Sequence, residues 1–226
     1  MPTAYLIPAR YGSSRFPGKM LTPIRGAAAV EFPFHACGAV AGENDLVRVV
    51  TDDGRIADVV GRQNAIFVTK EVANGTERCA LALESIPPEF TRVVIVAGDE
   101  TCVTPANIAA LVEASEAGGI WTAVSPYNQP AVTTVETEDK RIVKFERSNA
   151  LDYAALGLYV YPRAALMEYY YQWPMTARER IDGIELLRPF ERGEVIKAVC
   201  VDHPGYGLNT HADADLIEAW YTPDAS

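Results

Sequence analysis

The sequence has no apolar run long enough to cross a membrane. Its most apolar stretch, residues 92–98, has the length of a strand, whereas a membrane helix needs about 20 apolar residues. The N-terminal segment also lacks the basic region and the long apolar stretch of a secretion signal. We therefore expect a cytoplasmic protein with no membrane partner.

Cysteine and positive charge are scarce as well. The four cysteines, Cys37, Cys79, Cys102 and Cys200, show no paired spacing, so we expect buried or half-buried thiols rather than a zinc site or disulfides. The sequence has 20 basic and 30 acidic residues, which gives a formal net charge of −10. A chain this acidic lacks the broad basic surface that nucleic acids need, so no nucleic-acid partner is expected.

Strand-like and helical segments alternate over the first 125 of the 226 residues. Strands are expected at residues 3–9, 46–51, 65–69, 92–97 and 119–125, and helices at residues 28–41, 55–63, 76–85 and 105–117. The strands show no clean polar alternation, which is typical of a sheet covered on both faces. This pattern predicts an α/β fold with a doubly wound, mostly parallel, Rossmann-like sheet.

The pattern changes after residue 125. Strands are expected at residues 131–136, 141–145, 155–161 and 195–201, and helices at residues 163–173, 177–192 and 213–220. A hairpin turn is expected at residues 138–140. Because no repeat or low-complexity linker divides the chain, we predict one domain over residues 1–226. Its second part, about residues 126–205, forms a smaller β-rich lobe.

The loop after the first strand gives the clearest functional signal. It reads Ile7-Pro-Ala-Arg-Tyr-Gly-Ser-Ser-Arg-Phe-Pro-Gly-Lys19 and follows a strand end, where α/β sheets bind ligands. Glycines and serines let backbone N–H groups approach an anion, and Arg10, Arg15 and Lys19 add positive charge. The spacing fits neither a P-loop nor a GxGxxG fingerprint. We interpret it as a phosphate-binding loop; the alternative is an ordinary surface loop.

This loop resembles the signature of CMP-sugar synthetases, and within that family it is most similar to the CMP-Kdo synthetases (3-deoxy-manno-octulosonate cytidylyltransferases). Further segments match in the same order: Val50-Thr-Asp-Asp53, Asn74-Gly-Thr-Glu-Arg78, Val96-Ala-Gly-Asp-Glu100, Gly157-Leu-Tyr-Val-Tyr161 and Arg178-Glu-Arg-Ile-Asp-Gly-Ile-Glu-Leu-Leu-Arg188. Ordered matches over most of the chain are far more specific than any one of them. The resemblance implies a nucleotidyltransferase fold, with the nucleotide bound by about residues 1–125 and the sugar by about residues 126–205.

On the nucleotide side, the resemblance implies that the first loop wraps the triphosphate of CTP. It also implies that the turn beginning at Asn74 contacts the cytosine ring, although Asn-Gly before a helix is equally a plain turn and cap. The implied nucleotide-binding residues are Ala9, Arg10, Gly12, Ser13, Arg15, Lys19, Asp52, Asn74, Gly75, Thr76, Arg78 and Gly98.

Asp99 follows the most apolar strand, where a carboxylate can hold Mg²⁺ against phosphates. The resemblance implies this metal role, and a turn or N-cap aspartate is the alternative. It also implies that a sugar hydroxyl attacks CTP directly and that magnesium pyrophosphate leaves, without a covalent intermediate. The expected catalytic residues are Arg10, Lys19 and Asp99, and the expected cofactor is Mg²⁺.

The sequence departs from the family on the sugar side and at the second metal ligand. Asn209 stands where the family has an aspartate, so the implied metal ligands are Asp99 and Asn209, the latter uncharged. Ala97, Leu156 and Gly183 replace a glutamine, a histidine and a glutamate. The implied substrate-binding positions are Ala97, Leu156, Tyr159, Asp182 and Glu185. These losses of polar groups argue against simple Kdo recognition.

Assembly and histidine chemistry stay open at this point. The segment after Phe145-Glu-Arg147 is shorter than in the family, where it helps build the dimer. The resemblance suggests a homodimer, and the shorter segment puts that expectation in doubt. His203 and His211 flank a glycine-containing loop, and solvated side chains are expected there rather than substrate contacts.

The residues leave three functions open. The first is transfer of CMP from CTP to a Kdo-like sugar acid, with CTP and that acceptor as partners. The second keeps the fold but uses another nucleotide or an unusual acceptor, as Ala97 and Leu156 favour. The third is an inactive nucleotide-binding interaction module, which Asn209 motivates and the retained Lys19 and Asp99 disfavour.

Overall fold

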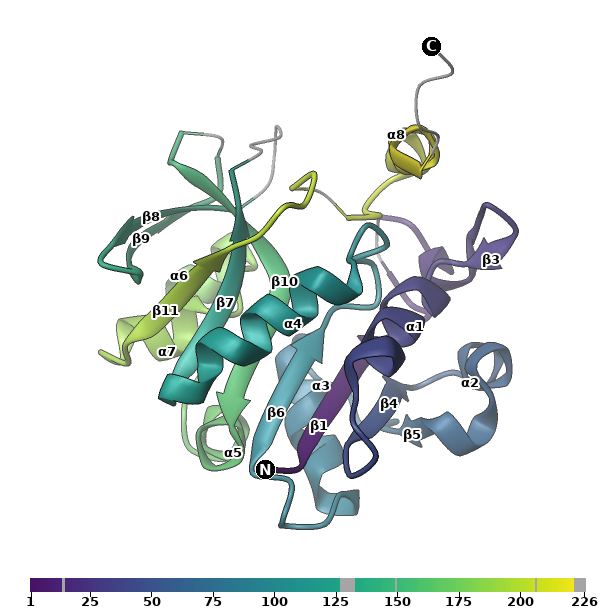
Figure 1. Ribbon diagram of the computed structural model, residues 1–226, viewed down its shortest axis with the longest axis horizontal. Helices are drawn as coiled ribbons and strands as arrows, with labels where there is room; N and C mark the ends of the chain where they lie inside the picture. The colour runs from purple at the N-terminus through teal and green to yellow at the C-terminus, as the bar shows by residue number, and fades with distance from the viewer. Residues whose placement is uncertain (14, 127–132, 149, 206, 222–226) are drawn as a thin grey trace.

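One mixed sheet runs through the whole molecule (Figure 1). The computed structural model describes residues 1–13, 15–126, 133–148, 150–205 and 207–221. In spatial order the nine strands are β5 (Ala65–Phe67), β4 (Leu46–Thr51), β1 (Thr3–Ala9), β6 (Arg92–Val96), β10 (Tyr153–Pro162), β7 (Ile120–Ser125), β11 (Ile196–Cys200), β9 (Arg141–Glu146) and β8 (Thr134–Glu138). The predicted α/β fold class is confirmed.

Strand direction divides this sheet into two parts. Strands β5, β4, β1 and β6 are parallel, as predicted, so their carboxyl ends meet at the upper edge in Figure 1. Strand β10 runs antiparallel between β6 and β7, while β7 and β11 are parallel to each other. The β-rich part of the chain therefore extends the nucleotide-side sheet rather than standing apart from it.

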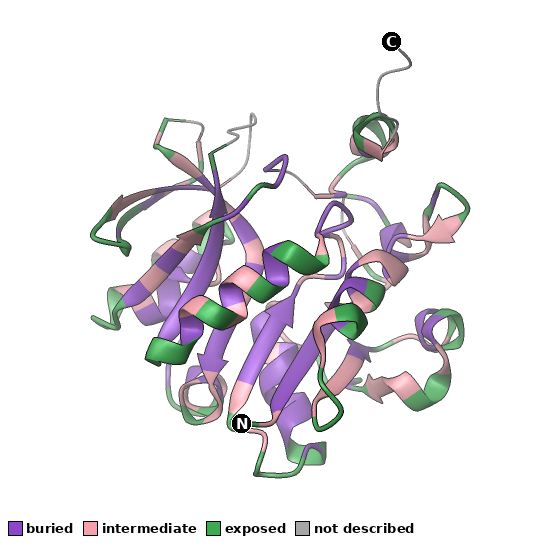
Figure 2. Cartoon of the chain, viewed as in Figure 1, coloured by how far each residue is buried: buried purple, intermediate pink, exposed green. Residues whose placement is uncertain are grey.

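Alternating residues of β1 build two different cores. Ala4 and Leu6 lie on the face covered by α3 (Gly75–Ala82) and α5 (Arg163–Tyr171). Tyr5, Ile7 and Ala9 lie on the other face, with α1 (Glu31–Val40), α2 (Gly54–Val60) and α4 (Pro105–Ala114). Both sets are buried because successive side chains of a strand point to opposite faces, and Figure 2 shows the central strands almost wholly buried.

Side-chain caps fix where the helices begin after these strands. Asp53 accepts a hydrogen bond from the N–H of Arg55 at 2.9 Å at the start of α2. Thr104 and Asn107 form a capping box around Pro105 at the start of α4, where the sequence predicts a helix start. Such caps satisfy N–H groups that have no partner inside the helix, and each is worth about 1 kcal/mol.

Two predicted helices have wrong bounds, because the backbone takes a left-handed conformation at or near one of their ends or within them. The helix predicted at 28–41 begins only at Glu31, because Arg25 and Gly26 (φ 50° and 84°) fold β2 (Pro23–Ile24) back onto β3 (Ala27–Ala28). The helix predicted at 177–192 ends at Gly183 (φ 66°), which separates α6 (Ala177–Asp182) from α7 (Leu187–Glu191). Left-handed glycine terminates helices readily.

The β8–β9 hairpin confirms the turn predicted at residues 138–140. Asp139 and Lys140 both have positive φ, at 47° and 65°, as two-residue hairpin turns require. The strand predicted at 131–136 starts at Thr134, and positions 131 and 132 lie outside the described residues.

Helix α8 (His211–Tyr221) packs against the first loop through Ile217, which lies in one apolar cluster with Phe16, Ile24 and Leu208. No helix in the described part is long and apolar enough to cross a membrane. Of the cysteines, Cys37, Cys79 and Cys102 are buried as expected, and Cys200 is exposed.

Leu6→Ala should lower the free energy of unfolding by about 2–5 kcal/mol, because Leu6 is fully buried in the middle of β1 and a cavity remains. Chemical denaturation followed by circular dichroism measures the change. Val59→Ala, an exposed position on α2, is the control and should cost less than about 0.5 kcal/mol. Equal losses in the two variants would contradict this description of the core.

Candidate active site

The carboxyl ends of β1 and β6 open into a cavity of about 900 Å³. The predicted site residues that line it are Arg10, Ser13, Arg15, Lys19, Asn74, Gly75, Arg78, Ala97, Asp99, Leu156, Tyr159, Glu185 and Asn209. Those that do not line it are Ala9, Gly12, Asp52, Thr76, Gly98 and Asp182. The cavity therefore joins most of the predicted nucleotide-side and sugar-side positions in one space.

The first loop is closed on a single carbonyl oxygen. Tyr11 O accepts hydrogen bonds from Ser13 N at 3.0 Å and from Gly18 N at 2.9 Å. The Tyr11 N–H donates to Asp52 at 3.2 Å, so Asp52 supports the loop from behind. Gly18 has φ 75° and lies against the Tyr11 ring, where a Cβ would come within 3.2 Å. This fold presents Arg10, Ser13 and Arg15 to the cavity.

Lys19 and Asp99 form an ion pair at the centre of the cavity wall. Asp99 follows the end of β6, and this segment lies close to β1 because the Gly98 N–H donates to Pro8 O at 3.2 Å. A Cβ on Gly98 would lie 2.9 Å from that oxygen, so the residue acts by allowing close approach. The side chain of Lys19 is 9% exposed and that of Asp99 24% exposed. The carboxylate thus remains open to the cavity while its partner is almost buried.

A late loop lies directly against Asp99. The Leu208 N–H donates to the Asp99 carbonyl at 2.8 Å, and Arg15 Nη2 donates to Asn209 Oδ1 at 3.0 Å. Asp213 accepts from the N–H groups of Asn209 and Thr210 at 2.9 and 2.7 Å. The carboxylate of Asp213 therefore caps α8, and Asn209 ties this loop to the first loop.

These residues fit a magnesium ion only together with phosphate ligands. Asp99 offers one open carboxylate, and the amide oxygen of Asn209 already accepts from Arg15. The described residues contain no group of three or more His, Cys, Asp and Glu side chains arranged for a metal. Mg²⁺ is commonly held by one or two carboxylates with phosphates and water, so Asp99 with a bound triphosphate satisfies its requirements.

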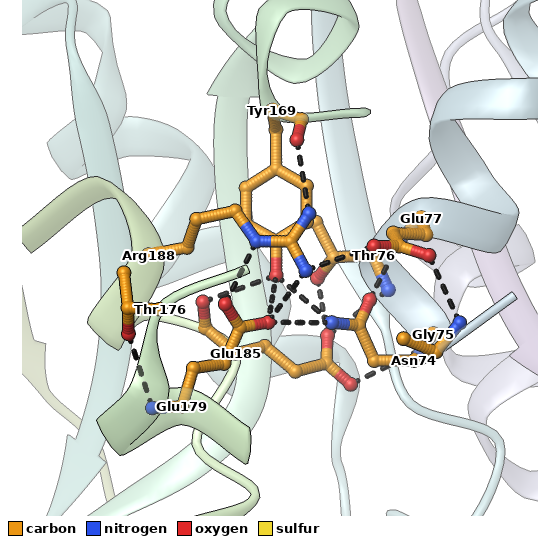
Figure 3. Close-up of polar contacts among 10 residues, drawn as sticks. Asn74, Gly75, Thr76, Glu77, Tyr169, Thr176, Glu179, Glu185 and Arg188 are labelled. Atoms are coloured by element: carbon orange, nitrogen blue, oxygen red, sulfur yellow. Dashed lines mark hydrogen bonds and ion pairs between the residues drawn. The ribbon is translucent and has the colours of Figure 1, made fainter. Parts of the chain in front are cut away.

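The turn at the start of α3 is held by a polar network (Figure 3). Asn74 Oδ1 accepts from Glu77 N at 2.8 Å, and Asn74 Nδ2 donates to Glu179 at 3.0 Å. Glu185 accepts from Gly75 N at 3.1 Å, from Thr76 N at 3.0 Å and from the Thr76 hydroxyl. Glu185, expected on the sugar side, therefore uses both oxygens to hold this turn, and Thr76 is buried behind it.

A buried arginine joins this network to three other helices. Arg188 is 1% exposed and contacts Glu179 at 2.7 Å and Glu77 at 2.8 Å. Its guanidinium lies 4.0 Å from the centre of the Tyr169 ring. Burial raises the pKa of Glu185 above its usual range, although hydrogen bonds from Gly75 and Thr76 favour the carboxylate. Sequence reasoning gave Arg188 and Glu179 no role, although both lie in the segment 178–188 that matches the family.

The sugar-side end of the cavity is mostly apolar and carries two further cations. Ala97, Leu156 and Tyr159 line it, with Arg147 and Arg180, which the prediction missed. The Arg147 guanidinium donates to the Thr133 hydroxyl at 3.2 Å. Asp182 instead pairs with Arg178 at 3.3 Å outside the cavity wall.

The expectation of solvated histidines is wrong for His203 and correct for His211. His203 is completely buried, because the chain after β11 turns inward under Glu100, while His211 is exposed and stacks on Phe16 at 3.8 Å. Burial and the neighbouring Asp99 charge raise the pKa of Glu100 to about 7. Burial lowers the pKa of His203 to about 4.

The fold is that of a nucleotidyltransferase, and a basic loop and a carboxylate lie together at the ends of its parallel strands. The chain belongs to the cytidylyltransferase family, since the family model described as "Cytidylyltransferase" matches residues 4–204.

The chain aligns with named relatives over almost its whole length. It is 31% identical to the 3-deoxy-manno-octulosonate cytidylyltransferase of Protochlamydia amoebophila, over 95% of this chain and 92% of the relative. It is 28% identical to the 8-amino-3,8-dideoxy-manno-octulosonate cytidylyltransferase of Shewanella piezotolerans, over 97% and 98%. A solved CMP:2-keto-3-deoxy-manno-octonic acid synthetase complexed with CTP has a TM-score of 0.86 and 26% identity, covering 97% of this chain and 98% of its own.

Arg188→Met should destabilise the protein by about 3–5 kcal/mol, because it leaves the buried carboxylate of Glu179 without its cation. Arg62→Met is the matched control, since Arg62 pairs with Asp58 on the surface and such pairs contribute about 0–1 kcal/mol. Denaturant midpoints and slopes of both variants give the comparison. Similar stabilities would show that the network in Figure 3 does not hold the turn.

Proposed function

We propose that this protein transfers CMP from CTP to a hydroxyl group of a Kdo-like 3-deoxy-keto sugar acid and releases pyrophosphate. The observation that carries the proposal is that one cavity is lined by three kinds of group. They are the cations Arg10, Arg15 and Lys19, the carboxylate of Asp99 with which Lys19 pairs, and the turn at Gly75 together with Ala97 and Leu156. The likeness to a synthetase complexed with CTP supports this assignment.

In this reaction the cavity residues position the two substrates and neutralise the negative charge of the phosphates. The acceptor oxygen forms a bond to the α-phosphorus, and the bond from that phosphorus to the pyrophosphate oxygen breaks. Arg10, Arg15 and Lys19 offset the charge that gathers on the leaving phosphates, and the closed first loop holds them in place beforehand. No side-chain nucleophile is required, because the acceptor itself attacks.

We propose Mg²⁺ as the cofactor, held by Asp99 and the bound phosphates with Asn209 alongside. When bound, the ion supplies neutralisation of phosphate charge. Lys19 keeps the Asp99 carboxylate pointed at the phosphate end of the cavity. Asn209 brings no charge, so the ion's affinity depends on the nucleotide more than it would with two carboxylates.

The residues that line the proposed acceptor end of the cavity are compatible with Kdo and with a modified relative of Kdo as the acceptor. Ala97 and Leu156 offer no hydrogen bonds, whereas Arg147 and Arg180 offer positive charge for an acid group. One relative is named for an amino-dideoxy form of the same sugar acid. A second candidate function is therefore cytidylyl transfer to such a modified acid. A homodimer stays a prediction.

The protein is mixed with CTP, Mg²⁺ and each of several 3-deoxy-keto sugar acids in turn. Pyrophosphate should be released only in mixtures that contain a sugar acid that the enzyme uses as acceptor. UTP and dTTP serve as controls and should give far less release, because the turn at Asn74 and Gly75 is expected to read the base. Binding of CTP without turnover for any acceptor would favour a non-catalytic nucleotide-binding module. Faster turnover with another nucleotide would contradict the cytidine assignment.

Asp99→Ala should lower kcat by about 100-fold or more, because removal of a preorganised charged group at such a site costs on that order. Asp58→Ala removes an exposed carboxylate on α2 and should leave kcat unchanged. Thermal unfolding of both variants checks that the fold is intact. Full activity in a folded Asp99→Ala protein would overturn the metal and catalytic assignment.

A further inference from the structure

Glu100 lies behind Asp99 and links the two ends of the cavity. It is 8% exposed, and its Oε1 accepts from Gly157 N in β10 at 2.6 Å. The Gly157 carbonyl in turn accepts from Ala97 N at 2.8 Å. A Cβ on Gly157 would lie 2.7 Å from that of Ala97, so this contact has no spare room. Glu100 therefore ties the end of β6 to the strand that floors the sugar-side cavity.

The second oxygen of Glu100 faces a buried histidine. Glu100 Oε2 lies 3.5 Å from His203 Nε2, and both atoms are buried without a hydrogen-bond partner among the described residues. Gly205 N donates to His203 Nδ1 at 3.1 Å, so this nitrogen is the acceptor. A neutral ring then carries its proton on Nε2, on the side of Glu100. A donor and a carboxylate thus face each other, slightly beyond hydrogen-bond length.

His203 also begins the loop that reaches the phosphate end of the cavity. Its carbonyl accepts from the Ser125 hydroxyl at the end of β7. Further along, a Cβ on Gly207 would lie 2.7 Å from the Asp99 carbonyl and 3.6 Å from Glu100 Oε2. The same loop ends at Asn209, which contacts Arg15. Gly207 and Asn209, which follow His203 closely in the chain, therefore lie against Asp99 and Arg15.

We propose that Glu100 and His203 form a buried positioning pair, which holds Gly205, residues 207–209 and the centre of β10 in fixed register with Asp99. The pair acts through these neighbours, so the phosphate end and the acceptor end of the cavity are aligned by one contact. Its kinetic consequence rests on the proposed cytidylyl transfer. The existence of the pair does not depend on that function, because both side chains lie in contact inside the protein without substrate.

Two substitutions separate the hydrogen bond that His203 accepts from Gly205 from its contact with Glu100. His203→Gln keeps a donor near the position of Nε2, and His203→Asn keeps an acceptor near the position of Nδ1. We expect His203→Gln to retain most of kcat. His203→Asn should lose kcat by as much as about 100-fold, since small misplacements of reacting groups cost on that order. KM for CTP should change less than kcat in either variant, because the first loop keeps its own hydrogen bonds to the Tyr11 carbonyl.

A double variant tests the contact itself. Glu100→Gln keeps an oxygen for the Gly157 N–H but turns an amide N–H toward His203, so that donor faces donor. Adding His203→Gln lets the second amide offer its oxygen, and we expect kcat of the double variant to exceed that of Glu100→Gln alone. Glu116→Gln and His35→Gln, both exposed, are the matched controls. Additive losses in the double variant would overturn the pairing.

A measurement without turnover separates this inference from the proposed function. In ¹⁵N-labelled protein, NMR should show His203 as the neutral form protonated at Nε2, with Nδ1 unprotonated. A ring protonated at Nδ1, or a charged ring at neutral pH, would overturn the pair whatever the enzyme does. Absence of pyrophosphate release from the wild type would contradict the proposed function instead. Equal kcat in both His203 variants, with equal thermal stability, would also overturn the positioning role.

Discussion

The ion pair between Lys19 and Asp99 lies beside a close backbone approach between the ends of β1 and β6, and both residues line the cavity. Gly98 allows this approach because its N–H bonds to Pro8 O and it has no side chain to intervene. A lysine that is almost buried then needs the carboxylate, while the carboxylate remains open to a ligand. The chain has a net charge of −10, yet Arg10, Arg15 and Lys19 all line this cavity, and such a local set of cations favours an anionic ligand.

A second constraint comes from the other side of the sheet. Arg188 neutralises Glu179 and Glu77 in the interior, and Glu185 holds the N–H groups at the start of α3. Breaking such a buried arrangement costs far more than a surface pair does, because charges would remain without partners. The turn at the start of α3 is therefore held in place by side chains of the protein itself. Rigid placement of this kind lowers the entropy cost of binding.

The sequence predicts the nucleotide half of the fold well and the acceptor half less well. Buried strands such as residues 3–9 and 46–51 have the predicted bounds, because a short apolar run between polar turns marks both ends of the strand. The helix at residues 177–192 is wrong because Gly183 adopts a left-handed conformation that composition does not reveal. The ordered position of β10 between β6 and β7 depends on long-range pairing and has no local signal.

The site divides in the same way. Arg10, Arg15, Lys19 and Asp99 lie near strand ends, and topology alone brings them together. Glu185 instead turns to the start of α3, and a residue's hydrogen-bond partners more than a hundred positions away cannot be deduced from its own neighbourhood. The burial of His203 is a similar case, because its polar sequence context favours solvent.

The identity of the product tests the central claim most directly. After incubation with CTP, Mg²⁺ and a 3-deoxy-keto sugar acid, ³¹P NMR and mass spectrometry should identify a phosphodiester that joins CMP to the sugar, together with free pyrophosphate. A product that carries a different nucleotide moiety, or hydrolysis of CTP with no sugar adduct, would contradict the account.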